Sequence, residues 1–201
     1  GSTVIYPPVS IPLRYVHTQR SERVHVNPTS DYYVTVSRLA KAKHIDLLIQ
    51  TANIHKLNLK IVGNGRDLQF LKSIAGDTVE FITNADDKKR DGLIADAKAF
   101  LFASVDEEFG IAPIEAMGYG TPVIALNSGG LKETVHNGLN GFLFDAMSTE
   151  SVYMAIKKFE SLSKERYTQM RKNARTEAEK YSTKRFETEI VDLIKKHIKS
   201  A

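Results

Sequence analysis

The sequence predicts an α/β fold, in which a doubly wound parallel sheet of about six strands is followed by a helical extension. Short apolar runs rich in β-branched and aromatic residues recur along residues 31–147, which is typical of strands buried in a sheet. Stretches with helical periodicity separate these runs. Strands that alternate with helices and are buried on both faces form parallel sheets, so both observations favour this fold class.

Six segments have the length and composition of strands. In such a sheet, ligands bind outside the carboxyl ends of the strands, where the chain turns into the next helix. We therefore expect functional residues directly after the strands. The expected strands are residues 32–36, 59–62, 79–82, 99–104, 122–126 and 141–144.

Helical stripes fill the intervals between the expected strands. In the first interval four apolar residues recur with helical spacing, and shorter stripes follow Gly65 and the pair Asp86-Asp87. Their apolar members are Ile45, Leu48, Ile49 and Ala52, then Leu68 and Leu71, then Leu93, Ile94 and Ala97.

The chain divides into three expected regions. Residues 1–30 hold four of the six prolines and have the character of a linker-like segment that enters the domain in extended form. Residues 31–147 form the α/β domain. Residues 148–201 are purely helical in pattern, with Ser148 as an N-cap, a second helix over 163–180 and a third from Thr183.

Charge is unevenly distributed. Residues 1–150 carry 15 Lys and Arg against 17 Asp and Glu, whereas residues 151–201 carry 13 against 7. Basic helices suit an anionic lipid surface, and peripheral membrane association through them is one option; a solvated helix face explains them better. Nothing combines aromatic and basic residues in a nucleic-acid-binding pattern, so we expect no nucleic-acid partner.

The remaining composition excludes several classes of protein. No apolar run approaches the roughly 20 residues of a membrane span, and the amino end does not resemble a signal peptide. Gly1-Ser2 resembles a cloning remnant, so we expect no targeting information to be readable there. Because there is no cysteine, disulfides are excluded and a cytoplasmic location is permitted, with the inner face of the membrane as an option. No histidine cluster or D-x-D motif indicates a metal.

Two expected loops carry features that suit phosphate. Residues 37–43 (S-R-L-A-K-A-K) follow the first strand and place Arg38 and Lys43 before a helix N-terminus, where cations suit a phosphate or diphosphate. Gly63 and Gly65 follow the second strand, and glycine lets a backbone approach a ligand closely. A solvated basic loop would explain the cations of residues 37–43 equally well, and a plain tight turn would explain Gly63 and Gly65.

Residues 107–115 (E-E-F-G-I-A-P-I-E) form the third such loop. Glu107 falls in the loop and Glu115 within the first turns of the next helix, on either side of a helix N-terminus whose exposed amides favour anions. Carboxylates accept pairs of hydrogen bonds from vicinal hydroxyls, so the two acids suit a ligand with both hydroxyls and phosphates. Glu108 is expected to be a bystander.

A fourth loop, after the fifth strand, contains Gly129-Gly130 and then Leu131-Lys132 at a helix start. A turn that needs positive φ would again explain the glycines alone. Four such loops at one edge of one sheet nevertheless converge on a single expected pocket, and its chemistry suits a diphosphate joined to sugars.

These motifs resemble a known family. The string from Glu107 to Glu115 continues as A-M-G-Y-G-T-P-V-I-A, and S-G-G-L-K-E-T-V and N-G-x-x-G-F-L follow. Together with V-S-R-L-A-K-A-K and I-V-G-N-G, they resemble the donor-binding, C-terminal domain of retaining GT-B glycosyltransferases of the glycosyl transferases group 1 (family 4) type. The resemblance is dense over residues 4–145 and implies a Rossmann-like domain that is one half of a GT-B fold.

The resemblance implies roles for individual residues. Glu107 would bind the hydroxyls of the donor sugar, as a sugar ligand or a nucleophile, and Glu115 the ribose. Arg38 and Lys43 would clamp the diphosphate and stabilise the leaving nucleotide. Further donor contacts are implied at Gly63 and Gly65, at Thr83, Asn84 and Ala85 beside the base, at Phe109, Gly110, Ile111 and Ala112, and at Gly129, Gly130 and Leu131.

The implied activity is hexosyl transfer, with retention, from a nucleotide diphosphate sugar to an acceptor hydroxyl in glycan, polysaccharide or glycolipid synthesis. No cofactor and no metal are implied. The residue string D-E-E-F-G-I-A-P-I-E-A resembles that of mannosyltransferase-like members of the family and favours GDP-mannose over a UDP-hexose as the donor.

Family enzymes have a second, N-terminal domain that binds the acceptor. The residues of this chain do not match that domain, so the chain alone is expected to be inactive or weakly active. A non-catalytic binding module and a related sugar phosphorylase or epimerase are the alternatives.

Two positions depart from the family pattern. Ser37 and His44 stand where glycines are usual, at the two ends of the basic segment. The last helix of the family crosses to the N-terminal domain, so we expect the apolar stripe of residues 183–199 to be exposed or repacked.

Overall fold

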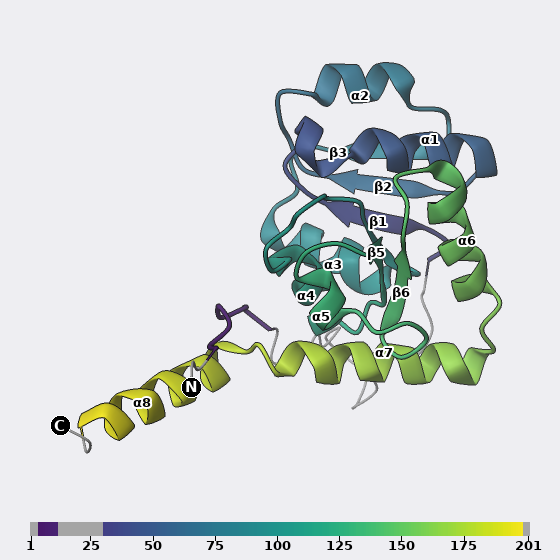
Figure 1. Ribbon diagram of the computed structural model, residues 1–201. Helices are drawn as coiled ribbons and strands as arrows, with labels where there is room; N and C mark the ends of the chain where they lie inside the picture. Colours follow the sequence, from purple (N-terminus) through teal and green to yellow (C-terminus); the bar gives the residue numbers. More distant parts are fainter. Residues whose placement is uncertain (1–3, 12–29, 199–201) are drawn as a thin grey trace.

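A computed structural model describes residues 4–11 and 30–198 of the chain. Six parallel strands form one sheet in the order β3-β2-β1-β4-β5-β6 (Figure 1). The strands are β1 (Tyr33–Val36), β2 (Leu59–Val62), β3 (Val79–Ile82), β4 (Phe100–Phe102), β5 (Val123–Leu126) and β6 (Gly141–Phe144). The predicted fold class and all six strands are confirmed, although β4 is shorter than expected.

Helices connect successive strands and then continue as a helical extension. The short turn η1 (Lys41–Lys43) and α1 (Ile45–His55) follow β1, and the other connections are α2 (Leu68–Ile74), α3 (Asp87–Asp96), α4 (Ile111–Gly118) and α5 (Leu131–Thr134). The extension consists of α6 (Thr149–Glu160), α7 (Lys164–Glu179) and α8 (Thr183–Ile198). Ser148 caps α6 as predicted, since its hydroxyl accepts a hydrogen bond from the Ser151 amide at 3.2 Å.

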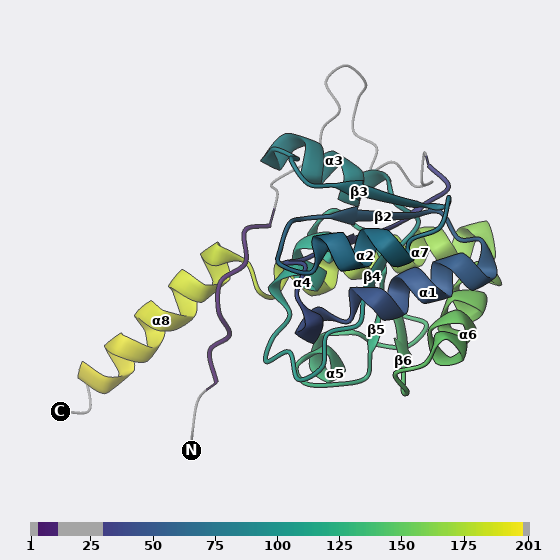
Figure 2. The ribbon, with the colours of Figure 1, turned by 90° about the horizontal axis from the view of Figure 1, so that it is seen from above.

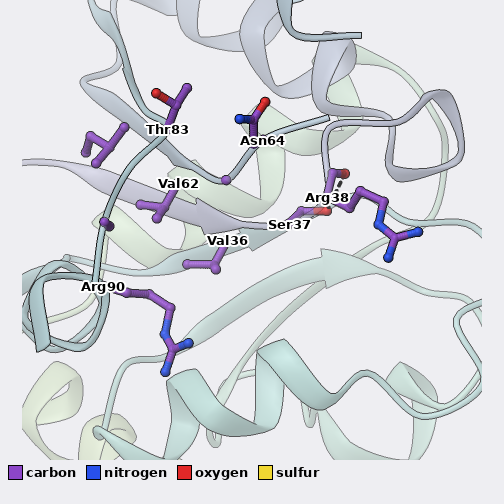
Figure 3. A pocket seen from close by; sticks show the side chains of 10 residues that line it. Val36, Ser37, Arg38, Val62, Asn64, Thr83 and Arg90 are labelled. Atoms are coloured by element: carbon purple, nitrogen blue, oxygen red, sulfur yellow. Dashed lines mark hydrogen bonds between the residues drawn. The ribbon is translucent and has the colours of Figure 1, made fainter. Parts of the chain in front are cut away.

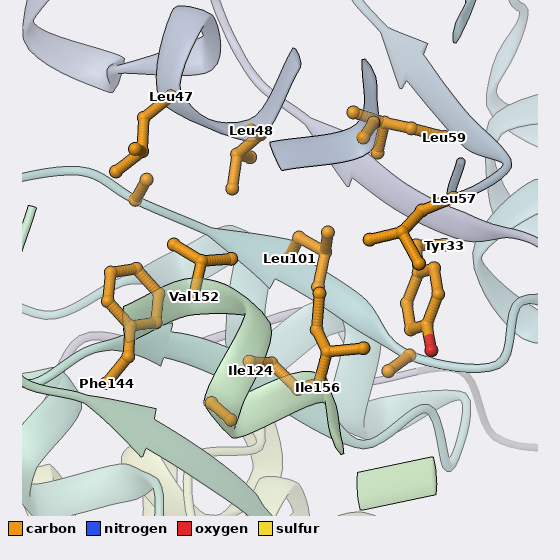
Figure 4. Close-up of a cluster of buried hydrophobic side chains, with 14 of the residues drawn as sticks. Tyr33, Leu47, Leu48, Leu57, Leu59, Leu101, Ile124, Phe144, Val152 and Ile156 are labelled. Carbon is orange, nitrogen blue, oxygen red and sulfur yellow. The ribbon is translucent and has the colours of Figure 1, made fainter. Parts of the chain in front are cut away.

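Each face of the sheet is covered by helices, which explains why most strands are apolar throughout (Figure 2). On one face α1 and α6 pack together over Tyr33, Leu101 and Ile124 (Figure 4). On the other face α4 and α7 pack together, and the alternate residues Val34 and Phe100 point into that layer. Two buried layers of this kind hold the strand ends in fixed positions.

The order in which the chain adds strands to the sheet reverses between β1 and β4, which makes this the topological switch point of the sheet. From β1 the chain continues outward to β2 and β3, whereas from β4 it continues to β5 and β6. The loops after β1 and β4 therefore leave a crevice between them at the carboxyl edge, which is where ligands bind in open α/β sheets.

A buried arginine fastens α7 to the sheet. Arg171 is 3% exposed, and its guanidinium donates hydrogen bonds to the carbonyls of Ala95 (3.0 Å), Ala97 (3.4 Å) and Tyr119 (3.4 Å). These carbonyls end α3, precede β4 and end α4. One side chain of α7 thus satisfies carbonyls at the carboxyl ends of both α3 and α4.

The segment 4–11 and the start of α8 meet beside α4. The Val9 amide donates to the Tyr181 carbonyl at 2.8 Å, and the Tyr6 ring packs on the rings of Phe109 and Tyr181, with centroids 5.6 and 5.3 Å away. The predictions for residues 1–3 and 12–29 lie outside the described residues.

Helix α8 projects away from the sheet in both ribbon views (Figures 1 and 2). Among its apolar side chains, Val191 is exposed by 45%, Ile194 by 52% and Ile198 by 71%, whereas Phe186, Ile190 and Leu193 are half-buried. The expected apolar stripe is thus only partly exposed in the described residues. No helix among the described residues is long and apolar enough to span a membrane.

We expect Arg171→Met to lower the free energy of unfolding by about 2 kcal/mol, because it leaves buried carbonyls without donors. Urea unfolding should show a lower midpoint with an unchanged slope. Arg166→Met is the matched control, since Arg166 lies on the same helix and is exposed. Equal midpoints for the two variants would contradict the anchoring role.

Candidate functional site

A pocket of about 370 Å³ opens at the carboxyl ends of β1, β2 and β3 (Figure 3). Val36 and Val62 form an apolar floor, and Arg38 and Arg90 lie on opposite sides of it. Arg38 is exposed and forms no ion pair with any residue that the structure describes. The lining residues are Val36, Ser37, Arg38, Val62, Gly63, Asn64, Ile82, Thr83, Ala85 and Arg90.

Lys43 bridges the crevice between the β1 and β4 loops. Its ammonium donates to the Glu107 carboxylate at 2.6 Å and to the Ser104 hydroxyl at 3.3 Å. Ser104 is 3% exposed and donates in turn to the Ala42 carbonyl at 3.4 Å. The ammonium of Lys43 is therefore held between the β1 and β4 loops by two hydrogen bonds, one to the buried Ser104 hydroxyl and one to the Glu107 carboxylate.

His44 stands where glycine is usual, and the conformation of the turn that follows Lys43 accounts for that preference. This residue ends η1 and precedes α1 with φ +48° and ψ +40°, which is the left-handed region that glycine occupies at least cost. The backbone conformation thus accounts for the usual glycine of the family at this position, and histidine adopts it here.

Gly63 and Gly65 hold the β2 loop against the β1 loop. Gly63 has φ +141°, and a Cβ atom there would lie 2.0 Å from the Ser37 carbonyl oxygen. A Cβ at Gly65 would lie 2.2 Å from the Leu39 oxygen. Both distances exclude a side chain, so close packing between loops requires these glycines. Gly63 also lines the pocket, whereas Gly65 does not.

The glycines after β5 hold the β4 loop in the same way. The Gly130 amide donates to the Glu107 carbonyl at 2.9 Å, and a Cβ at Gly129, where φ is +52°, would lie 2.1 Å from that oxygen. Ser128 adds a contact, because its hydroxyl accepts from the Asp106 amide at 3.2 Å. The backbone beneath the Glu107 side chain is therefore fixed by the neighbouring loop.

Gly110 is the N-cap of α4, and no side chain caps the amides that follow it. Ile111 is 49% exposed, so the first turn of this helix is open at the carboxyl edge. Phe109 turns its ring toward Tyr6 instead, which leaves its backbone as the part nearest the loop. Leu131 is 1% exposed and packs beneath Gly110, so its side chain belongs to the core.

Glu115 and Arg90 form a charged group between α3 and α4. Partial burial raises the pKa of Glu115, and Asp91 and Asp87 raise it further, while the cation of Arg90 opposes the change. Arg90 is held at 2.9 Å from Asp91 and 3.0 Å from Asp87. The positive charge of Arg90 therefore offsets only part of the cost of ionising Glu115 in this partly buried position.

The structure thus divides the predicted site residues into neighbouring groups. Arg38, Gly63, Thr83 and Ala85 line the pocket. Lys43, Glu107, Gly129 and Gly130 form a second group through the contacts above, outside the pocket lining. Asn84 is exposed outside the pocket lining, and Ala112 is partly buried in the first turn of α4.

Sequence reasoning did not identify Arg90 or Ser104. Arg90 lies in the run D-D-K-K-R-D, which has the pattern of a solvated helix face, and only the packing of α3 beside the pocket distinguishes it. Ser104 ends an apolar run, and a polar residue at a strand end is a usable but weak signal. Across 4–11 and 30–198, no group of three or more His, Cys, Asp and Glu residues is arranged to hold a metal ion.

Comparison with curated proteins gives relatives that include mannosyltransferases. Over 175 aligned residues the chain is 26% identical to the alpha-1,3/1,6-mannosyltransferase ALG2 of Candida glabrata, covering 66% of this chain and 38% of that enzyme. It is 33% identical over 148 residues to the GDP-Man:Man(3)GlcNAc(2)-PP-Dol alpha-1,2-mannosyltransferase of Mus musculus, covering 66% of this chain and 30% of that enzyme. The chain thus spans well under half the length of these relatives.

Solved structures share the fold. The pneumococcal O-GlcNAc transferase GtfA, in complex with UDP and GlcNAc, superposes with a TM-score of 0.73 at 23% identity, covering 94% of this chain and 38% of that one. Sucrose-phosphate synthase from Thermosynechococcus elongatus superposes with a TM-score of 0.75 at 22% identity, covering 87% and 47%. The family model of glycosyl transferases group 1 matches residues 18–177, so this chain belongs to the glycosyl transferases group 1 family.

Proposed function

We propose that this chain is the donor-binding domain of a retaining hexosyltransferase that uses a nucleotide diphosphate sugar. The observation that carries the proposal is the Lys43–Glu107 pair at 2.6 Å, beside the Arg38-rimmed pocket. Cations and a carboxylate at a switch point suit a diphosphate and a hydroxylated sugar, respectively.

In the proposed reaction the bond between the anomeric carbon and the diphosphate breaks, and the acceptor oxygen forms a new bond to that carbon. The acceptor proton moves to the departing phosphate oxygen on the same face of the sugar. Arg38 and Lys43 stabilise the negative charge that develops on the leaving group. Glu107 binds the sugar hydroxyls in this scheme.

The pocket suits the nucleoside. Val36, Val62 and Ile82 offer apolar surface to a base, and Thr83 and Asn64 offer polar groups at its edge. In this scheme Glu115 accepts hydrogen bonds from the two ribose hydroxyls, which would offset the burial that raises the pKa of this carboxylate.

We favour GDP-mannose as the donor over a UDP-hexose. Support comes from the residue string around Glu107 and from relatives whose names specify mannosyltransfer, one of them from GDP-mannose. The GtfA subunit of Streptococcus agalactiae, 36% identical over 118 residues, is named instead for UDP-N-acetylglucosamine. Titration with GDP and UDP decides between the two bases.

The same proposal assigns the acceptor to a second domain outside these residues. Residues 1–30 are then the linker, residues 31–147 the nucleotide-sugar domain, and residues 148–201 the helices that reach the second domain. Synthesis of a glycan, polysaccharide or glycolipid in the cytoplasm, without a metal, is the matching cellular role, and the basic helices would allow contact with the inner face of the membrane.

We expect GDP or UDP to bind the chain in calorimetry, and Glu115→Gln to weaken that binding about fivefold to tenfold because a charged acceptor is lost. Glu108→Gln, at an exposed neighbouring position, should leave it unchanged. If neither nucleotide binds below about millimolar concentration, which is the weak end of specific affinities, the proposed function is wrong.

Glu115→Gln should also raise the melting temperature of the free protein at about pH 7. Since the folded-state pKa of Glu115 is raised, the ionised carboxylate lowers stability there, and that penalty disappears as the pH falls and the folded protein protonates it. The difference in melting temperature between variant and wild type should therefore shrink toward about pH 4. A difference independent of pH would contradict this assignment.

Arg38→Met should weaken binding of a nucleoside diphosphate about tenfold, and of the monophosphate less, because a charge-assisted contact to the second phosphate is lost. The melting temperature should stay constant, since Arg38 is exposed and pairs with no acid within residues 4–11 and 30–198. Arg66→Met, at another exposed arginine near the same edge, is the control. Equal losses for mono- and diphosphate would argue against the clamp.

A further inference from the structure

The Lys43–Glu107 ion pair joins the two groups that the proposed function assigns to different parts of the donor. Lys43 serves the diphosphate and Glu107 the sugar, yet in the ligand-free protein each is the partner of the other at 2.6 Å. Their side chains are 31% and 24% exposed, so the pair is only partly screened by solvent. Any ligand that engages one group therefore alters the other.

Both ends of the pair are anchored from behind. The ammonium of Lys43 is held by the buried Ser104 hydroxyl at 3.3 Å, and the Glu107 backbone is held by the Gly130 amide at 2.9 Å. Movement of Lys43 toward a diphosphate would consequently lengthen its contact with the Glu107 carboxylate, because the Gly130 amide holds the backbone that carries Glu107.

The cost of that movement depends on the ligand. A nucleoside diphosphate draws the lysine away and leaves a partly buried carboxylate without its cation, and the negative phosphates add repulsion. An intact nucleotide sugar brings hydroxyl donors to the same carboxylate. The broken ion pair is then replaced by new hydrogen bonds only when the sugar is present.

We propose that the Lys43–Glu107 pair selects the intact nucleotide sugar over the free nucleoside diphosphate. The inference rests on the proposed function, and it adds a specificity role to Glu107 that its contact with the sugar alone does not imply. It also means that the product diphosphate is bound less tightly once the sugar has left, which favours its release.

The test is to titrate the chain and its Glu107→Gln variant with GDP and GDP-mannose, and with UDP and UDP-glucose. Glutamine removes the ion pair but keeps the side-chain length. We expect it to tighten binding of the diphosphate roughly three- to fivefold and to weaken binding of the matching sugar donor. Opposite signs for the two ligands are the distinguishing result.

Two further variants make the result specific. Glu108→Gln removes the same charge one residue away, at an exposed position, and should leave the ratio of the two affinities unchanged. In a Lys43→Met background, Glu107→Gln should no longer tighten diphosphate binding, because no pair remains to be broken.

The inference is overturned if Glu107→Gln weakens or does not change diphosphate binding, if Glu108→Gln tightens it equally, or if the gain persists without Lys43. These outcomes leave the proposed function intact as long as the wild-type chain binds a nucleotide. Absence of nucleotide binding by the wild-type chain, in contrast, removes the proposed function and the inference with it.

Discussion

The pairing of β1 with β4 is the interaction on which both the core and the candidate site depend. The Val34 amide donates to the Ala99 carbonyl at 3.1 Å, and the Lys98 amide to the Tyr32 carbonyl at 2.9 Å. These bonds join the two halves of the parallel sheet, to which the chain adds strands on opposite sides: β2 and β3 beyond β1, and β5 and β6 beyond β4. They also bring Lys43 beside Glu107, 64 residues later in the sequence, so the proposed chemistry depends on this contact between two strands.

Much of the fold could be predicted from the sequence because its signals are local. Each strand is a short apolar run, and the Ser148 cap depends on a residue three positions away. Features that depend on contacts between distant segments could not be predicted. Arg171 looks like any basic residue of a helix until α7 lies against the ends of α3 and α4, and Arg90 gains its place only from the neighbouring pocket.

The site residues show the same division. The pattern of glycines after strands indicated tight turns at the carboxyl edge, and the turns are there. What each glycine approaches could not be read from the pattern, because it is set by the loop of the adjacent strand: Gly63 meets Ser37, and Gly129 meets Glu107. The spacing of Glu107 and Glu115 placed them on either side of a helix start, but it did not reveal that the first has a cation partner while burial raises the pKa of the second.

The aromatic contact of Tyr6, Phe109 and Tyr181 has a mechanical consequence. The segment 4–11 and the junction between α7 and α8 are tied to each other by the Val9 amide, and both press on Phe109, the residue directly before the N-cap of α4. A displacement of this junction relative to the sheet is therefore transmitted first to the loop between Glu107 and Gly110. That loop leads directly into the first turn of α4, where Ile111 is 49% exposed.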